Sequence, residues 1–276
     1  MTADDLGFTP SVTAGILEAH HAGSVTATSM MVQQPGWDDA VRAARATPTL
    51  DVGLHLNVLV GAPLTSARSL TDARTGSFLP LSALVLRALS GRIDAAEVEA
   101  ECTAQFAALV AAGIHPTHMD SHRHTHALPG VRGAVSRVAA AHGVWLRRPL
   151  ESPALFAADA AAQLHRAVIR AAWTVSEAGA IRVRHTDHFA GIALQGGTHF
   201  DARLDLVLEQ LRPGVTELMV HPGRVDDALR ALDGYTWQRE RELAALTSRP
   251  LRDRLARGAR GITNPVVLIG FRALTA

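Results

Sequence analysis

The chain has 276 residues, enough for one large α/β domain or two small ones. Hydrophobic residues make up 47% of the chain and charged residues 19%, so the sequence can bury a substantial core and is not that of a disordered protein. The formal net charge of +1 gives no overall field that would attract nucleic acid.

The sequence contains no lysine, because every basic residue other than histidine is arginine. This excludes Schiff-base lysines, P-loop lysines and sites built on a carbamylated lysine. Cys102 is the only cysteine, which excludes disulfides within the chain and zinc sites made of cysteine clusters. The chain starts without a signal-peptide pattern, and no apolar run approaches the ~18 residues of a membrane span. We expect a cytoplasmic protein without membrane insertion.

Patterns typical of strands and of helices alternate along the chain. The first strand pattern covers only residues 1–3, fewer than the ~5 usual for an interior strand, so this strand looks clipped. Later strands are predicted at 24–32, 51–57, 117–121, 144–146, 181–185 and 216–220, with a last strand or sheet edge at 266–269. Helices are predicted at 11–21, 36–46, 81–89, 95–112, 131–142, 157–178, 200–211, 239–246 and 251–257.

The alternation of strands and helices predicts an α/β fold with a parallel sheet, open or closed. Seven or eight strands within ~250 residues favour a distorted (β/α) barrel of the TIM type. No repeat, low-complexity tract or linker divides the chain, so residues 1–276 are expected to form a single domain. The long loop at 61–80, rich in Gly, Pro, Ser and Thr, is expected to form a flap or insertion over a site.

Polar side chains follow five of the predicted strands at their carboxyl ends. They are Asp4 and Asp5, His55, Asp120 and His122, Asp187 and His188, and His221. The carboxyl edge of a parallel barrel is where catalytic residues lie. Five strands with the same arrangement therefore predict an active site at this edge.

The densest part of this pattern is the stretch 117–126, in which four histidines and Asp120 together occupy every second position. In an extended strand the first and last of them would lie ~26 Å apart at ~3.3 Å per residue, so one ion cannot bind all four. The strand must end near Asp120 or the residue after it. His122 is then the best placed imidazole. His124 and His126 are candidates for contacts with the ligands or the substrate, and one of them could be an ordinary loop histidine.

The paired carboxylates and the strand histidine each have a structural interpretation. Asp4 and Asp5 could cap a helix or make a turn. As a functional pair, one would bind a metal and the other would accept a proton from water. His55 lies between leucines, where a lone histidine is more often a hydrogen-bonded core residue, but the available co-ligands favour a metal ligand. One carboxylate and two imidazoles with open positions are typical of a hydrolytic metal site.

The later candidates are also open to two interpretations. Asp187 and His188 form either a local turn pair or part of the pocket lining. His221, in a His-Pro-Gly sequence at a strand exit, is either a polar turn residue or a general acid, since histidine titrates near neutral pH. The arginines at 239–260 most simply form a solvated helical face, with an interface or anion-binding patch as the minority interpretation.

Five motifs together resemble those of the YdjC-like carbohydrate deacetylases, a family that includes the chitooligosaccharide deacetylases. In chain order they are Thr-Ala-Asp-Asp-Leu-Gly at 2–7, Val-Thr-Ala-Thr-Ser-Met-Met-Val at 25–32, Val-Gly-Leu-His-Leu-Asn at 52–57, Thr-His-Met-Asp-Ser-His-Arg-His-Thr-His at 117–126 and Glu-Leu-Met-Val-His-Pro-Gly at 217–223. The stretch 235–248, which begins at Tyr235 and includes Arg239, resembles the family's C-terminal region.

The resemblance implies a distorted barrel related to the polysaccharide deacetylases, one divalent metal ion, Mg²⁺ or Zn²⁺, and commonly a homodimer. It implies that Asp5, His55 and His122 bind the metal. It also implies that Asp4 is the general base and that His221 matches the late catalytic histidine.

Two positions in the first motif depart from the family pattern. Thr2 stands where many members have Asn, and Leu6 stands where they usually have Phe. The threonine form is similar to a branch associated with hopanoid lipid biosynthesis, so a substrate other than chitin is an open alternative.

We therefore expect metal-assisted removal of an N-acetyl group from an amino sugar or a short oligosaccharide, with Asp120 orienting a ligand. One alternative is another metal-dependent amidohydrolase or phosphoesterase on a barrel, and another is a sugar- or metal-binding protein without activity. The aromatic side chains available for stacking on a sugar are Trp37, Phe78, Trp145, Phe189, Tyr235 and Trp237.

Overall fold

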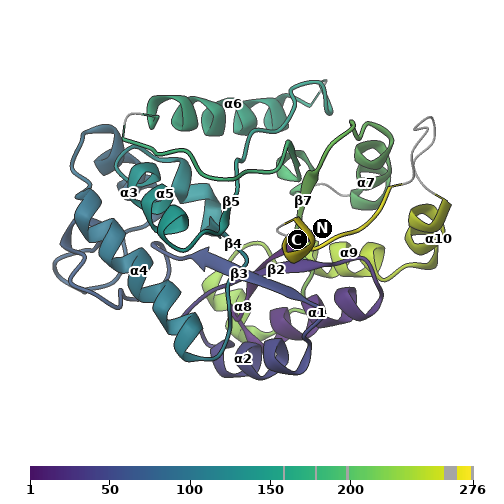
Figure 1. Ribbon diagram of the computed structural model, residues 1–276, viewed down its shortest axis with the longest axis horizontal. Helices are drawn as coiled ribbons and strands as arrows, with labels where there is room; N and C mark the ends of the chain where they lie inside the picture. Colours follow the sequence, from purple (N-terminus) through teal and green to yellow (C-terminus); the bar gives the residue numbers. More distant parts are fainter. Residues whose placement is uncertain (158, 178, 197–198, 258–265, 275–276) are drawn as a thin grey trace.

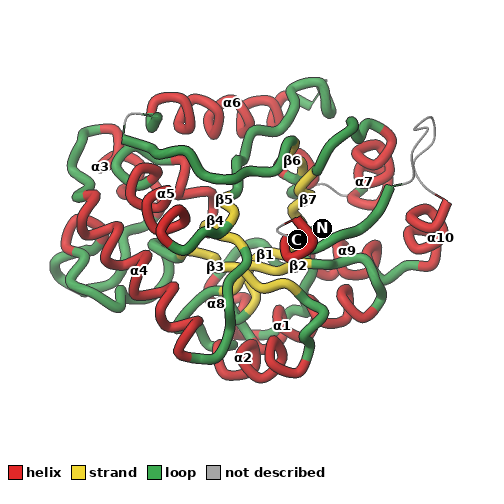
Figure 2. The backbone as a smooth tube through the Cα atoms, in the orientation of Figure 1, coloured by secondary structure: helices red, strands yellow, loops and turns green. Residues whose placement is uncertain are grey.

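The computed structural model describes residues 1–157, 159–177, 179–196, 199–257 and 266–274. Its centre is a curved sheet of seven parallel strands in the order β5-β4-β3-β2-β1-β7-β6. The strands are β1 (Thr2–Leu6), β2 (Ala27–Met30), β3 (Asp51–Leu56), β4 (His118–Ser121), β5 (Trp145–Leu146), β6 (His188–Ala190) and β7 (Thr216–Val220). Figure 2 shows these strands at the middle of the molecule.

The sheet does not close into a complete barrel within the described part of the chain. Its edge strands are β5 and β6, and the only pairing between their two sides is an isolated parallel bridge from Glu151 to Phe189. The predicted distorted (β/α) barrel is therefore confirmed, in the form of a half-barrel. The strand order places β1 between β2 and β7, so the first and the last strand of the chain are neighbours within the sheet.

Helices surround this sheet on the outside (Figure 1). They are α1 (Pro10–His21), α2 (Trp37–Ala46), α3 (Leu81–Leu89), α4 (Ala95–Ala111), α5 (Arg132–Ala141), α6 (Ala160–Val175), α7 (Phe200–Glu209), α8 (Asp227–Leu232), α9 (Trp237–Leu246) and α10 (Arg249–Arg257). Short 3₁₀ turns lie at η1 (Arg68–Leu70), η2 (His122–Ala127), η3 (Ile192–Leu194) and η4 (Phe271–Leu274). None of the helices in the described ranges is long and apolar enough to cross a membrane.

The longest helix, α4, illustrates how local sequence sets these elements. Asp94 caps its first turn by accepting a hydrogen bond from the Ala96 amide. Val98, Cys102 and Leu109 recur at helical spacing on one face and are completely buried. The same face of α4 packs on β3, whose six residues are all buried. Cys102 is thus a small apolar core residue, as its position in the predicted helix indicated.

Three predicted segments differ from the structure. The first strand is a full five residues, Thr2–Leu6, so that Asp4 and Asp5 lie within it and not after it. The strand predicted at 181–185 is wrong, since this segment is extended loop that gives β5 one backbone hydrogen bond, from the Leu146 amide to the Arg184 carbonyl. The strand predicted at 266–269 is also loop.

Two further predictions need adjustment. The loop at 61–80 packs against α4 and does not cover the candidate site described below: the Glu101 carboxylate accepts hydrogen bonds from Leu64 and Thr65. The helix predicted at 157–178 is α6 (Ala160–Val175), and residues 158 and 178 of the predicted range lie outside the described residues.

Candidate active site

The carboxyl end of β1 is irregular, and this irregularity presents two successive carboxylates. The register between β1 and β2 shifts between Ala3 and Leu6, and Asp5 has a φ of 74°, in the left-handed region. Successive residues of a regular strand face opposite sides of the sheet, and a bulge re-aims them. Here Asp4 and Asp5 both line the same cavity, each with its own partners.

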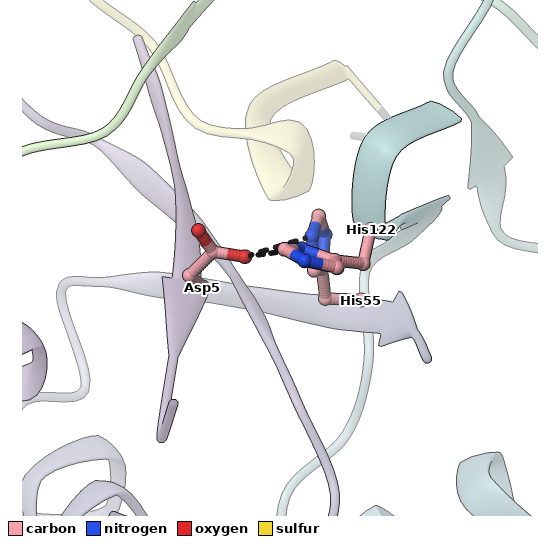
Figure 3. Close-up of side chains that lie close together, drawn as sticks. All are labelled: Asp5, His55 and His122. Carbon is pink, nitrogen blue, oxygen red and sulfur yellow. Dashed lines mark hydrogen bonds and ion pairs between the residues drawn. The ribbon is translucent and has the colours of Figure 1, made fainter. Parts of the chain in front are cut away.

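Asp5 meets two imidazoles from other strands. Its Oδ1 lies 3.1 Å from His55 Nε2 and 3.0 Å from His122 Nδ1. His55 comes from β3, and His122 opens η2 directly after β4 (Figure 3). All three side chains are buried, and their ligand atoms lie within 4.8 Å of one another. A carboxylate oxygen and two ring nitrogens at this spacing can hold one metal ion.

His55 is oriented by groups on its other ring nitrogen. Its Nδ1 lies 2.6 Å from Asp120 Oδ1, on the neighbouring strand β4, and 3.0 Å from Ser29 Oγ on β2. A histidine whose second nitrogen is held by a carboxylate turns its first nitrogen toward a metal in a fixed tautomer. This carboxylate–imidazole pair is an observation of the structure that fits a metal site.

The electrostatics of the buried cluster fit a cation as well. Burial disfavours the protonated form of His55, yet the carboxylates of Asp120, Asp5 and Asp4 raise its pKa to about 10. Burial also disfavours ionisation of Asp5, but Arg239, His122 and His55 hold the pKa of Asp5 well below its usual value. The carboxylates thus favour a positive charge where the imidazoles converge, and a metal ion would supply it.

Arg147 lies behind these residues in the interior of the half-barrel. Its guanidinium lies 2.6 Å and 2.7 Å from the two oxygens of Asp4, 2.7 Å from Asp120 Oδ2 and 2.8 Å from Glu217 Oε1. Despite complete burial, the carboxylates around it raise the pKa of Arg147 well above its usual value. The same guanidinium therefore holds two carboxylates in place. One is Asp4, which is not among the three candidate metal ligands, and the other is Asp120, which orients His55.

His221 directly follows β7 and lies near Asp4. Its Nε2 lies 3.9 Å from Asp4 Oδ2 and 3.4 Å from the Gln195 side-chain amide. The backbone amide of His221 donates to the carboxylate of Glu242, which also accepts a 2.6 Å hydrogen bond from the Tyr235 hydroxyl. The rings of His221 and Tyr235 are edge to face, with centroids 5.6 Å apart.

A cavity of about 330 Å³ lies at the carboxyl edge of the sheet. The sequence candidates that line it are Asp4, Asp5, His55, His122, His124 and His221. Of the aromatic residues considered for sugar stacking, Tyr235 lines it. A second cavity of about 360 Å³ lies at the amino edge, near Thr2 and Thr216, and contains none of the candidates.

Four candidates do not reach the cavity. Asp120 lies behind His55, which agrees with an orienting position. His126 is fully buried and bonded to Ser121 Oγ and the Arg147 carbonyl. Asp187 directly precedes β6 and His188 is its first residue, so both lie at the amino edge, because the strand expected before them does not exist. There Asp187 accepts from the Val215 amide, and the His188 ring contacts the Pro213 carbonyl.

Sequence reasoning missed Arg147, and it misread Arg239. Arg239 is 1% exposed, and its Nη2 lies 2.6 Å from Asp5 Oδ2, so it does not belong to a solvated face. Arg147 directly follows β5 at the same carboxyl edge as the other candidates. The strand-end criterion could have found Arg147, whereas nothing in the helical pattern of 239–246 distinguishes Arg239 from its neighbours.

The model of the YdjC-like protein family matches residues 1–257. The chain belongs to the YdjC-like family. It is 34% identical over 257 residues to a carbohydrate deacetylase of Vibrio vulnificus (strain CMCP6), an alignment that covers 91% of this chain and 88% of that protein. It is 32% identical over 274 residues to a carbohydrate deacetylase of Listeria monocytogenes serotype 4a (strain HCC23), covering 99% of this chain and 98% of the relative.

A solved structure has a similar fold over nearly the whole length of this chain. It is the crystal structure of a proposed cellobiose-phosphate cleavage protein from Enterococcus faecalis V583. The two chains superpose with a TM-score of 0.78 at 26% identity, covering 99% of this chain and 97% of the other. The half-barrel is therefore shared with this protein.

Proposed function

We propose that this YdjC-like protein is a metal-dependent carbohydrate deacetylase, a hydrolase that removes an N-acetyl group from an amino sugar or a short oligosaccharide. The observation that carries the proposal is the buried group Asp5, His55 and His122 beside a separate carboxylate, Asp4, in one cavity. The relatives named carbohydrate deacetylase support the substrate class. The alternatives of a phosphoesterase or a protein without activity have no comparable support.

Asp5, His55 and His122 would hold one divalent ion, and Asp120 would keep His55 in the required tautomer. When bound, such an ion polarises an acetamide carbonyl and lowers the pKa of a water molecule. Two imidazoles favour Zn²⁺ or another transition metal, whereas the family resemblance includes Mg²⁺. The identity of the ion is tested by elemental analysis of the purified protein.

Asp4 is proposed to accept the proton of the attacking water. Arg147 holds both of its oxygens, which fixes the carboxylate at the cavity wall. His221 is proposed to protonate the departing amine, because an unprotonated amine anion is a very poor leaving group. Its Nε2 is on the cavity side and 3.9 Å from Asp4, so the two groups could act on one bound acetamide.

The remaining cavity wall would contact the sugar. His124 and Tyr235 line it, and the Tyr235 hydroxyl is bonded to Glu242. The family resemblance is the basis for proposing, in addition, a homodimer. A cytoplasmic location and a single domain over residues 1–276 remain proposals from the sequence pattern.

The test measures acetate released from N-acetylated chito-oligosaccharides by metal-stripped protein to which Zn²⁺ or Mg²⁺ is returned. Asp4→Asn is expected to lower the rate by at least ~100-fold, since a general base contributes about 10²–10⁴-fold. Asp187→Asn is the matched control, because this carboxylate lies at the amino edge, and it should keep the wild-type rate.

Folding of both variants is checked by circular dichroism and metal content by elemental analysis. Absence of metal-dependent acetate release from every N-acetyl sugar tested, with folded and metal-loaded wild type, would reject the deacetylase. An Asp4→Asn variant as active as Asp187→Asn would reject Asp4 as the base while leaving the reaction in place.

A further inference from the structure

Arg239 on α9 places a guanidinium against one oxygen of Asp5. Its Nη2 lies 2.6 Å from Asp5 Oδ2, while the imidazoles of His55 and His122 face the other oxygen, Oδ1. The two oxygens of this carboxylate thus have separate partners. A carboxylate that is free to rotate can bind a metal through one oxygen or two, and Arg239 occupies one of them.

The guanidinium of Arg239 is itself held in place. It is among the largest completely buried side chains, and its Nε donates a 2.9 Å hydrogen bond to the Tyr235 carbonyl. Its central carbon lies 5.9 Å from the Phe8 ring and 5.6 Å from the Tyr235 ring. A buried guanidinium with these contacts has little freedom to leave Asp5 Oδ2.

Further contacts connect Arg239 with the residue next to His122, another of the candidate metal ligands. Arg239 Nη2 lies 3.2 Å from Asp233 Oδ2, and Asp233 Oδ1 lies 2.8 Å from Arg123 Nη2. Arg123 is the residue directly after His122. The chain of contacts Asp5–Arg239–Asp233–Arg123 therefore begins at Asp5 and ends at the residue next to His122, whose imidazole faces Asp5 Oδ1.

The backbone at this point is strained. Arg123 has φ 52° and ψ 31°, and His124 has φ 54° and ψ 30°, so two successive residues other than glycine are left-handed. Such conformations persist only where their surroundings enforce them. The ion pair of Arg123 with Asp233 is one contact that holds this turn, and the turn sets the direction of His122.

We infer that Arg239 is a positioning residue that restricts Asp5 to a one-oxygen ligand and so keeps positions on the metal open for water and substrate. The inference rests on the proposed function for the identity of the ligands. Helix α9, which carries Arg239, would then influence the metal site although it supplies no metal ligand. Without Arg239, Asp5 could turn its second oxygen to the metal.

The experiment compares wild type with Arg239→Met after loading with Co²⁺, whose visible absorption depends on the number of its ligands. Arg239→Met is expected to bind Co²⁺ at least as tightly as wild type in competition with a chromophoric chelator, and to show weaker visible bands. Acetate release should fall by ~10–100-fold, the range found when groups that support metal ligands are removed.

Two further variants provide the comparison. Arg241→Met removes an exposed arginine from the same helix, and Arg239→Lys retains a cation that can donate to Asp5 Oδ2. Both are expected to keep the wild-type Co²⁺ spectrum. If Arg239→Met does not fold, the double variant with Asp233→Asn takes its place, because it removes the charge of a second carboxylate that has lost its contact with Arg239.

A spectrum of Arg239→Met identical to that of wild type would overturn the inference. Loss of Co²⁺ binding by the folded variant would also overturn it, because Arg239 would then hold the site together rather than limit Asp5. The Co²⁺ spectra do not depend on turnover. A wild type that binds Co²⁺ but releases no acetate would therefore reject the proposed deacetylase without deciding the part played by Arg239.

Discussion

At the scale of single residues, Arg147 is the cation that pairs with the buried acids of the site. The carboxylates of Asp4, Asp120 and Glu217 all contact its guanidinium, and none of the four side chains is exposed by more than a few per cent. Burial opposes ionisation of Asp120, yet Arg147 and His55 hold its pKa below the usual value. A buried charge without a partner is far more costly than a buried pair.

Arg147→Met is expected to lower the free energy of unfolding by about 3–5 kcal/mol, the usual cost of removing one partner from a buried ion pair. Urea unfolding at neutral pH, followed by circular dichroism, measures it. The control is Arg148→Met, because Arg148 is the next residue and is only half-buried, where it donates to the Asp187 carbonyl. Equal losses in the two variants would show that the carboxylates do not depend on Arg147.

Some residues of the candidate site can be recognised from the sequence around them, and others cannot. Asp5, His55 and His122 stand in motifs next to predicted strand ends, and the structure brings these three together. Arg239 has no such signal, because its partner Asp5 is 234 positions away and only the fold, in which α9 packs on α1 and α7, brings them together. Buried arginines that pair with distant acids cannot be told from surface arginines by helical periodicity.

At the scale of elements, the prediction of strands failed in two situations. One is a very short strand, and the other is an apolar segment that pairs with no strand. The segment at 181–185 has alternating β-branched residues but makes only scattered bonds to the β5 side. The strand that does pair with β7 is three residues long, His188–Ala190. Because this strand starts at His188, the pair Asp187 and His188 falls at the amino edge, and the expected place in the pocket was wrong.

The C-terminal segment gains its place by packing, not by strand pairing. Phe271 of η4 stacks on His118 of β4, with ring centroids 4.0 Å apart, and is 7% exposed. Arg272 next to it pairs with the carboxylate of Asp51, the first residue of β3. Figure 1 shows both chain ends together at this edge of the sheet, and Thr26 contacts the carbonyls of both Met1 and Ile269.

Phe271→Ala is expected to lower the free energy of unfolding by about 3–5 kcal/mol, because a buried ring is replaced by a cavity against His118. The matched control, Val267→Ala, removes an apolar side chain that is 68% exposed in the same segment and should cost less than about 0.5 kcal/mol. Urea unfolding compares them. Metal affinity should be unchanged in both, since the segment lies at the amino edge, and a weakened metal site in Phe271→Ala would contradict this placement.

At the scale of the whole molecule, the curved parallel sheet has a separate cavity at each of its two edges. The amino edge is closed by the C-terminal segment, and the carboxyl edge carries the candidate site. The alternation of strands and helices was enough to predict this architecture, since parallel strands joined by helices place all carboxyl ends together. The missing closure between β5 and β6 was not predictable, because it depends on how two-residue and three-residue strands pair.

Buried neutral histidines make the stability of the whole fold depend on pH. Burial lowers the pKa of His118 to about 4 and that of His126 to about 3, from about 6.5 in the unfolded chain. Below pH 6.5 the unfolded chain therefore takes up protons that the folded chain does not, and stability falls as the pH falls toward those values. The raised pKa of His55 has no effect in this window, because below pH 6.5 both states of His55 are protonated in the metal-free protein.

For metal-free protein, the free energy of unfolding is expected to fall between pH 6.5 and pH 4.5, with a slope of up to about 1.4 kcal/mol per pH unit for each such histidine. His118→Phe should reduce the slope by one such increment, since phenylalanine can stack on Phe271 but cannot bind a proton. His115→Asn, at an exposed position three residues earlier, should keep the wild-type slope. Urea unfolding at half-unit pH steps with chelator present measures all three. A slope that His118→Phe leaves unchanged would mean that His118 is already protonated within the folded core, and that its stacking on Phe271 tolerates the charge.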